Sequence, residues 1–191
     1  IKYLATEPMP GFLDTLKAKC PEAETMQLSA DKIPLPDTSV KTVVAAQCFH
    51  WFATKEALNE IYRVLVPNGK FVLVWNHKLR TVPWLDEIDV VVTENYGDTP
   101  RALNYTWKRL MDEYPKFKCI QHSTLDGIKW QGSREDIVSH FESISVISSL
   151  DSETKPVVLQ KFRDILDKHF DKSLSEIDMP FETELYVCSK V

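Results

Sequence analysis

The fold is decided by residues 40–75, which read VKTVVAAQCFHWFATKEALNEIYRVLVPNGKFVLVW. Residues 40–47 form an almost continuous apolar run, which is typical of a strand covered on both faces in a parallel sheet. Thr54 is placed to cap a helix that runs to about Leu65, and residues 70–75 indicate the next buried strand. A strand, a helix and a strand at these spacings predict parallel pairing through a right-handed crossover.

Elements of the same two kinds extend in both directions from this segment. Further strands are predicted at residues 1–5, 24–28 and 181–191, with one strand or two within 117–130. Further helices are predicted at about 10–20, 82–96, 100–114 and 152–170, and a helix-start box of Ser133 and Asp136 begins another. The sequence contains no internal repeat or low-complexity segment, so we expect one α/β domain over residues 1–191.

Composition excludes several classes of function. The 191 residues carry 23 Lys and Arg against 28 Asp and Glu, and they form no dense basic stripe, so no nucleic-acid partner is expected. No apolar run approaches the roughly 18 residues of a membrane span, and no membrane partner is expected. The four dispersed cysteines fit a reduced, cytoplasmic protein. The five glycines form no G-x-G pair, so a dinucleotide-binding glycine loop is absent from this sequence.

Four motifs carry a resemblance to a known family. In chain order they are Glu7-Pro8, SADKIPLPDTSV at residues 29–40, AQCFHWF at 46–52 and EIYRVLVPNG at 60–69. As a series they resemble the class I S-adenosylmethionine-dependent methyltransferases, nearest the small-molecule branch similar to trans-aconitate methyltransferases. The resemblance implies a Rossmann-like methyltransferase sheet that is mostly parallel, with residues 183–190 as its antiparallel closing strand.

The resemblance also implies S-adenosylmethionine as cofactor and places the residues that bind it. Glu7 stands at the position of the acid that accepts both ribose hydroxyls, and an acid at the carboxyl end of a parallel strand suits that role. The alternative for Glu7 is a solvated loop carboxylate before a helix. The alternative for residues 29–31, which the resemblance places at the adenine, is a polar loop where the chain leaves a strand. The implied cofactor-binding residues are Glu7, Met9 beside the adenine, Ser29, Ala30 and Asp31 at its edge, and Gln47 near the methionine part.

The tetrapeptide Phe49-His50-Trp51-Phe52 is the most unusual stretch of the chain. On the rim of a cleft its aromatic rings would exclude water, and His50 would act as a base or orient a carboxylate of a small-molecule substrate. The alternative is that the cluster seals the following helix onto the sheet. Trp51 and Trp84 are the expected substrate-binding residues, and residues 77–135 are expected to form a substrate cover. Cys48 and His50 have no second pair of ligands, so no metal site is expected.

The chain departs from the family at its first motif. In the family a central first strand, followed by a glycine-rich turn, pairs between the strands that begin here at residues 1 and 42. Its absence predicts a gap in the sheet with unpaired backbone groups. Three explanations follow: a partial sequence of a methyltransferase, a non-catalytic binding or structural protein whose strands have closed up or exchanged within a homodimer, or another doubly wound domain.

Overall fold

A computed structural model describes residues 3–191, which form two compact units. Unit 1 contains the chain up to Leu73, together with Ala102–Gln121 and Tyr186–Val191. Unit 2 contains Val74–Arg101 and His122–Leu185. Helices and strands occur in both, so the chain has the expected α/β class. Residues 77–135, the expected substrate cover, are divided between the two units, and their role as a cover stays a prediction.

Unit 1 begins with a small parallel sheet. Its strands β1 (Leu4–Glu7) and β2 (Glu24–Gln27) pair in the register Leu4↔Glu24 to Glu7↔Gln27. The helix α1 (Pro10–Lys19) connects them and starts at a proline, where the missing N–H costs nothing. These three elements confirm the predicted order, except that residues 1 and 2 of the first expected strand lie outside the described residues.

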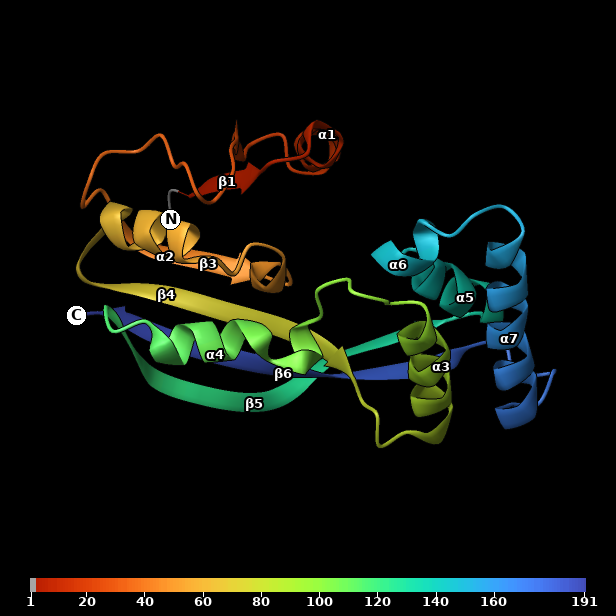
Figure 1. Cartoon of the computed structure of the whole chain (residues 1–191). Helices are drawn as coiled ribbons and strands as arrows, with labels where there is room; N and C mark the ends of the chain where they lie inside the picture. The colour runs from red at the N-terminus through yellow and green to blue at the C-terminus, as the bar shows by residue number, and fades with distance from the viewer. Residues whose placement is uncertain (1–2) are drawn as a thin grey trace. The chain divides into compact units, whose positions relative to one another are not determined.

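The second sheet has four strands in the order β3-β4-β6-β5. Their bounds are Val40–Ala46 for β3, Leu65–Lys78 for β4, Phe117–Gly132 for β5 and Ile177–Lys190 for β6. The arrows of β3 and β4 point the same way and that of β6 points back, so the sheet is mixed (Figure 1). The closing strand is therefore antiparallel, as expected, and residues 117–130 lie in one long strand.

β1 and β3 belong to different sheets. The gap that the sequence predicts between these strands is therefore present among the described residues, and the two strands have not closed up. The prediction that residues 40–47 are covered on both faces is wrong. Of β3 only Ala45 is buried, while Val44 is 59% exposed. β3 is the edge strand of its sheet, so fewer neighbouring side chains cover it than cover a central strand.

The helix α2 (Lys55–Val64) follows β3, as predicted. The Thr54 side chain accepts a hydrogen bond from the Ala57 N–H at 3.2 Å and caps its first turn. At the other end Lys190 of β6 donates hydrogen bonds to the carbonyl oxygens of Tyr62 and Leu65, both at 2.7 Å. Both ends of the helix are therefore satisfied by named side chains.

The helix predicted at 100–114 is interrupted. It consists of the 3-10 turn η2 (Ala102–Asn104) and the helix α4 (Thr106–Glu113), with Tyr105 between them at φ 54°. A left-handed residue cannot continue a right-handed helix, which explains the break. The indole of Trp107 donates a hydrogen bond to the Ala102 carbonyl at 2.9 Å and holds the two pieces together.

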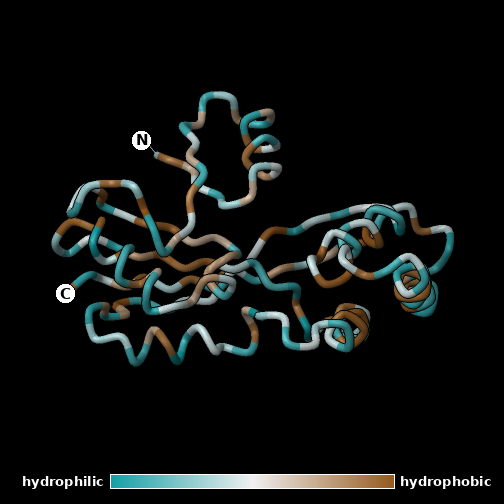
Figure 2. The backbone as a smooth tube through the Cα atoms, turned by 45° about the horizontal axis from the view of Figure 1, so that its top comes forward, coloured by the Kyte–Doolittle hydropathy of each residue, from teal (hydrophilic) through white to brown (hydrophobic). Residues whose placement is uncertain are grey.

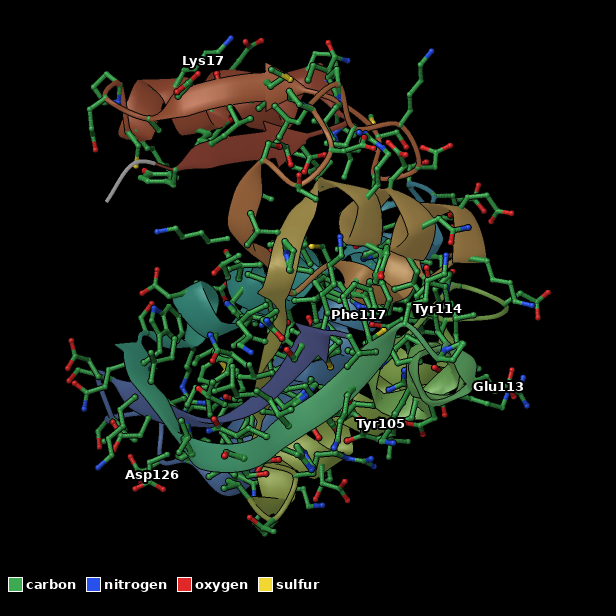
Figure 3. All side chains as sticks on the ribbon, turned by 90° about the vertical axis from the view of Figure 1, so that its left-hand side faces the viewer. Lys17, Tyr105, Glu113, Tyr114, Phe117 and Asp126 are labelled. Atoms are coloured by element: carbon green, nitrogen blue, oxygen red, sulfur yellow. The ribbon has the colours of Figure 1, made fainter. Side chains whose placement is uncertain are left out.

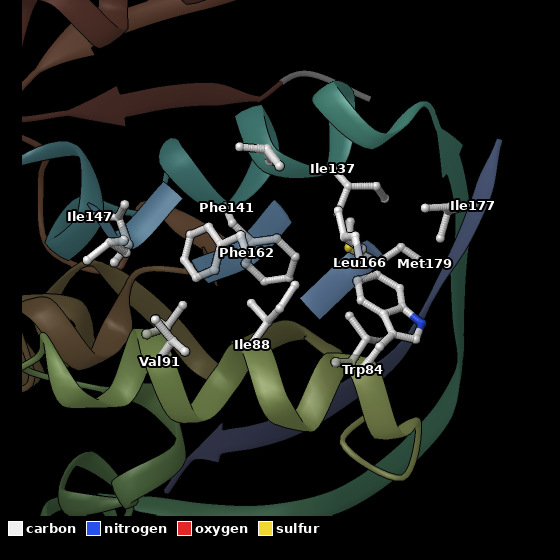
Figure 4. Close-up of a cluster of buried hydrophobic side chains, with 14 of the residues drawn as sticks. Trp84, Ile88, Val91, Ile137, Phe141, Ile147, Phe162, Leu166, Ile177 and Met179 are labelled. Atoms are coloured by element: carbon white, nitrogen blue, oxygen red, sulfur yellow. The ribbon is translucent and has the colours of Figure 1, made fainter. Parts of the chain in front are cut away.

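Unit 2 has one apolar core. Four helices contribute to it, namely α3 (Pro83–Glu94), α5 (Arg134–Glu142), α6 (Ser145–Ser148) and α7 (Thr154–His169). Side chains from α3, α5 and α7, among them Ile88, Phe141 and Phe162, point toward one another (Figure 4). Hydrophobic and hydrophilic residues alternate along these helices in Figure 2, as expected where one face is buried.

The start of α5 confirms the predicted box. The Ser133 side chain accepts a hydrogen bond from the Asp136 N–H, and the Asp136 carboxylate accepts one from the Ser133 N–H at 2.9 Å. Within residues 3–191 no helix is long and apolar enough to cross a membrane.

Candidate functional site

Glu7 is the last residue of β1, and its half-buried carboxylate organises the turn into α1. Its Oε1 atom accepts a hydrogen bond from the Met9 N–H at 3.0 Å. Gln27 lies opposite Glu7 on β2, and its side-chain amide donates a hydrogen bond to the Pro8 carbonyl oxygen at 2.9 Å. Hydrogen bonding thus holds the Glu7 carboxylate at the carboxyl end of a parallel strand, which is the edge where open α/β sheets bind ligands.

The loop after β3 lies within electrostatic range of Glu7. Gln47, its first residue, has φ 59°, a left-handed conformation that is uncommon for a residue other than glycine and often marks a functional turn. At the next position burial raises the pKa of the Cys48 thiol to about 11, and the negative charge of Glu7 contributes to the same shift. The carboxyl ends of β1 and β3 therefore converge, although the two strands are in separate sheets.

The aromatic tetrapeptide divides between the core and solvent. It forms the 3-10 turn η1 (Phe49–Trp51), in which residues three apart lie on one side. Phe49 is fully buried and packs edge-on against Phe52 and Phe71, with ring centroids 5.4 and 5.3 Å apart. Trp51 is 48% exposed, and its ring lies 5.3 Å from that of His50. Phe49 therefore belongs to the apolar core, whereas Trp51 is partly exposed beside a half-buried His50.

The segment expected at the adenine edge follows β2. Ser29 and Lys32 form an isolated antiparallel bridge, and the Lys32 N–H donates to the Ser29 carbonyl at 3.1 Å. Ser29 and Asp31 are exposed and Ala30 is half-buried. Because β1 and β2 are parallel and in register, this turn leaves the sheet at the same edge as Glu7. Met9, the residue before α1, is 57% exposed.

Sequence reasoning missed the residue that anchors the next loop, Arg63 of α2. Its guanidinium donates hydrogen bonds to the Ile33 and Leu35 carbonyls at 2.7 and 2.8 Å and contacts the carboxylates of Glu60 and Asp37, each at 2.8 Å. The Glu60 carboxylate in turn accepts a hydrogen bond from the Ile33 N–H at 2.9 Å. The only sequence signal is the Glu60–Arg63 spacing on one helix face, because the loop lies some 30 residues upstream.

The Arg63 contact also explains the acidity of Glu60. Hydrogen bonds from the Arg63 guanidinium and the Ile33 N–H lower the pKa of the Glu60 carboxyl to about 2. The partnership raises the pKa of Arg63 in return. Residues 33–37, which follow the segment expected to border the adenine, are thus held to α2 by hydrogen bonds to their backbone and by the Arg63–Asp37 ion pair.

Trp84 belongs to the other unit of the chain than the remaining predicted residues. It belongs to α3 in unit 2, is 4% exposed, and packs edge-on against Phe170 with centroids 5.6 Å apart. A buried indole contributes to the core, so the structure adds no support for its predicted contact with substrate, which stays a prediction.

A polar cluster on β4, β5 and β6 was also missed. In unit 2 the buried carboxylate of Glu184 lies 3.3 Å from His77 Nε2 and 3.1 Å from His122 Nε2. Two imidazoles offset the cost of burying this carboxylate. No group of three or more His, Cys, Asp or Glu residues within 3–191 is arranged to hold a metal ion.

Comparison with known proteins connects these features to a family. A family model described as a methyltransferase domain matches residues 1–73, which contain β1, β3 and the converging loops. An uncharacterized methyltransferase of Schizosaccharomyces pombe is 34% identical over 193 residues, which cover all of this chain and 75% of that relative. A methyltransferase-like protein of the same organism is 45% identical over 109 residues, which are 57% of this chain and 43% of that relative.

Solved structures share the fold. A geranyl diphosphate methyltransferase in complex with S-adenosylmethionine superimposes with a TM-score of 0.51 at 11% identity, over all of this chain and 69% of that one. At this identity the likeness concerns the arrangement of elements alone.

Proposed function

Because the chain belongs to the class I S-adenosylmethionine-dependent methyltransferases, we propose that it transfers a methyl group from that cofactor to a small-molecule acceptor. The observation that carries the proposal is the convergence of Glu7 with the Gln47–Cys48 loop at the carboxyl ends of β1 and β3. A nucleoside cofactor bound at that edge would have Glu7 beside its ribose and the Gln47–Cys48 loop beside its methionine part.

Glu7 suits the ribose. One oxygen of its carboxylate accepts the Met9 N–H, and the other has no hydrogen-bond partner among the described residues. A carboxylate held in this way is an acceptor for a sugar hydroxyl, and a hydrogen bond to a charged group is stronger than one between neutral groups. Gln47, in its left-handed turn, is assigned to the methionine part.

The adenine is assigned to Met9 and the turn after β2. The exposed thioether of Met9 offers a polarizable surface to a flat ring. Asp31 and Ser29 are exposed and offer oxygen acceptors to an exocyclic amine. Arg63 and Glu60 act as positioning residues for this part of the site, because they hold the loop that follows the turn.

The acceptor side is assigned to His50 and Trp51. The cofactor supplies an electrophilic methyl group, so the protein has to align the acceptor and exclude water. The exposed indole of Trp51 gives an apolar wall, and His50 beside it orients an acidic acceptor or removes a proton from one that must lose it. An acidic small molecule of the kind used by the trans-aconitate branch suits His50, which would orient its carboxylate.

The homodimer formed by strand exchange is proposed alongside, because β1 and β3 belong to separate sheets and each has an edge without a strand partner among residues 3–191. Light scattering after size-exclusion chromatography tests it, and a monomer at micromolar concentration contradicts it.

Calorimetric titration with S-adenosylhomocysteine tests the cofactor assignment in the natural protein that carries this sequence. Glu7→Gln keeps the shape and removes the charge, so we expect affinity to fall about 10-fold to 100-fold. Asp14→Asn, on the exposed side of α1, is the matched control and should bind like the unaltered protein. Equal affinity of Glu7→Gln and the control would refute the ribose assignment.

A further inference from the structure

Two cysteines of unit 1 lie side by side on neighbouring strands. Cys119 belongs to β5 and Cys188 to β6, which are neighbours in the sheet, and the Cys119 thiol donates a hydrogen bond to the Gln121 carbonyl at 3.3 Å. Both line one cavity of about 30 Å³ that α4 covers with Trp107 and Met111. The other two cysteines, Cys20 and Cys48, do not line this cavity.

The two cysteines lie on neighbouring strands and line the same cavity, and one backbone hydrogen bond indicates how the ends of these strands pair. The Val191 N–H donates to the Lys116 carbonyl at 3.1 Å, which defines one hydrogen-bonded pair of the antiparallel ladder. A regular ladder continued three residues inward from this bond along both strands reaches Cys119 and Cys188, at a position without ladder hydrogen bonds. Opposite Cα atoms at such positions are about 4.5 Å apart, which is within the range that disulfides span.

The two thiols differ in access. Cys119 is exposed at the edge of the sheet, since β5 is the last strand in the order, whereas Cys188 is 3% exposed. Burial raises the pKa of the Cys188 thiol to about 12, so at neutral pH it is a protonated and shielded group. An oxidant from solution therefore meets Cys119 first.

We propose that Cys119 and Cys188 form a reversible disulfide when hydrogen peroxide oxidises the exposed Cys119. The Cys119 thiolate attacks one peroxide oxygen, the O–O bond breaks, and the leaving hydroxide takes a proton as water, which leaves a sulfenic acid. The Cys188 sulfur then attacks the Cys119 sulfur, the S–O bond breaks, and the thiol proton of Cys188 leaves with the hydroxyl group as a second water. In sum two thiols and one peroxide give one disulfide and two waters.

The bond would join two of the four points at which the chain crosses between its units. The chain passes from unit 1 to unit 2 after Gln121 and returns at Tyr186, and each cysteine lies two residues from one of these crossings. Oxidation would therefore close residues 119–188 into a loop whose base is in unit 1. This inference concerns a modification site and does not depend on the proposed function.

The test uses the intact protein, exposed to hydrogen peroxide in its native state and then denatured in the presence of N-ethylmaleimide. After proteolysis without reductant, mass spectrometry should find the Cys119 and Cys188 peptides joined, with the loss of two hydrogens, while Cys20 and Cys48 carry the alkylating group. Dithiothreitol should restore the separate peptides. The rate of linkage should not change when the protein is diluted, because both thiols belong to one chain.

Variants separate the proposal from nonspecific oxidation. Cys188→Ser should leave Cys119 as a sulfenic acid that dimedone captures, and Cys20→Ser should leave the link intact. Cys188→Ala repeats the first variant without burying a hydroxyl, and circular dichroism checks that both fold. Cys119 recovered as a sulfinic acid with Cys188 alkylated would overturn the proposal, and so would a link between the Cys119 residues of two chains.

Discussion

The carboxylate of Glu7 acts on two neighbours of different kinds. Through one oxygen it fixes the Met9 N–H at the start of α1, and through its charge it opposes ionisation of the Cys48 thiol after β3. Cys48 is therefore a probe for the part of unit 1 where β1 and β3 converge. Its reactivity reports on Glu7 without any ligand being present.

Glu7→Gln should lower the pKa of Cys48 from its value of about 11. The variant removes the nearby negative charge but leaves burial, the larger cause, in place, so the shift is partial. We expect alkylation of Cys48 by iodoacetamide to become about threefold to tenfold faster at a fixed pH below the pKa. The rate is followed on the Cys48 peptide by mass spectrometry, with Asp14→Asn as control. An unchanged pH profile would show that the two residues are not near each other.

The contact between Glu60 and Arg63 makes the stability of the protein depend on pH in the acid range. The folded pKa of Glu60 is about 2, below its ordinary value of 4.5, so its contribution to stability is full above pH 4.5 and is lost as the pH falls toward 2. In Arg63→Gln most of this contribution is absent at every pH. Urea unfolding at several pH values should therefore show a steeper loss of stability in acid for the unaltered protein than for Arg63→Gln. Parallel pH curves would contradict the assigned ion pair.

At the scale of elements, α2 is held by residues from other parts of the chain. Its carboxyl end meets Lys190 of β6, a buried lysine whose ammonium also lies 4.1 Å from the centre of the Tyr62 ring. A cation at the carboxyl end of a helix satisfies orphan carbonyls and opposes the negative end of the helix dipole. The strand that closes the sheet thus also caps the helix beside the proposed acceptor site.

Lys190→Met should destabilise the protein by about 2–3 kcal/mol, because it removes charge-assisted hydrogen bonds and leaves two carbonyl groups without a donor. The comparison is Lys118→Met on the exposed part of β5, for which we expect a change within about 0.5 kcal/mol. Urea denaturation followed by circular dichroism measures both. Equal midpoints for the two variants would argue against the capping role.

The helix starts show what local sequence is able to predict. Thr54 and Ser133 cap helices as expected, since a cap depends on residues within one turn. The interruption at Tyr105 and the exposure of β3 were not predicted, because backbone strain and edge position depend on the assembled sheet. The Arg63 anchor and the Cys119–Cys188 contact join residues too distant in sequence for any periodic pattern to reveal.

For the whole molecule, the division into two units predicts that a substitution in the core of one unit destabilises that unit more than the other. Phe162 of α7 is completely buried in the core of unit 2, where its ring lies 5.5 Å from that of Phe141. The apolar cores of the two units are lined by different helices, with α2 and α4 in one and α3, α5 and α7 in the other. In unit 1 the rings of Tyr114 and Phe117 pack together where α4 leads into β5 (Figure 3).

Phe162→Ala should cost about 3–5 kcal/mol, the usual range for a large cavity in a core. In native-state hydrogen exchange, amides of α3 and α7 should lose protection while those of α2 keep it. Val157→Ala on the exposed face of the same helix, 58% exposed, is the matched control and should change neither. Equal loss of protection in α2 would mean that the chain unfolds as a single cooperative body.

The motifs of residues 7–69 led to the family and to the converging loops, but the sequence did not reveal that the sheet is shared between two units. β4, β5 and β6 each run from one unit into the other, and the alternation of buried and less buried residues in β4 and β6 continues across the boundary. A two-residue hydrophobic periodicity predicts which residues form a strand, but it does not predict which of the two compact units each residue belongs to. Trp84 illustrates the limit, because an indole looks the same in a sequence whether it lines a core or a binding site.

The sheet of β1 and β2 has few buried apolar side chains, and this affects how ligand binding could be detected. Of α1 only Leu13 is buried, and Phe12 is 68% exposed, so β1, α1 and β2 have few apolar contacts to keep them closed. These amides should exchange with deuterium sooner than those of the other sheet. A nucleoside bound at Glu7 would slow that exchange throughout β1, α1 and β2, so binding can be detected there even when the melting temperature of the protein hardly moves.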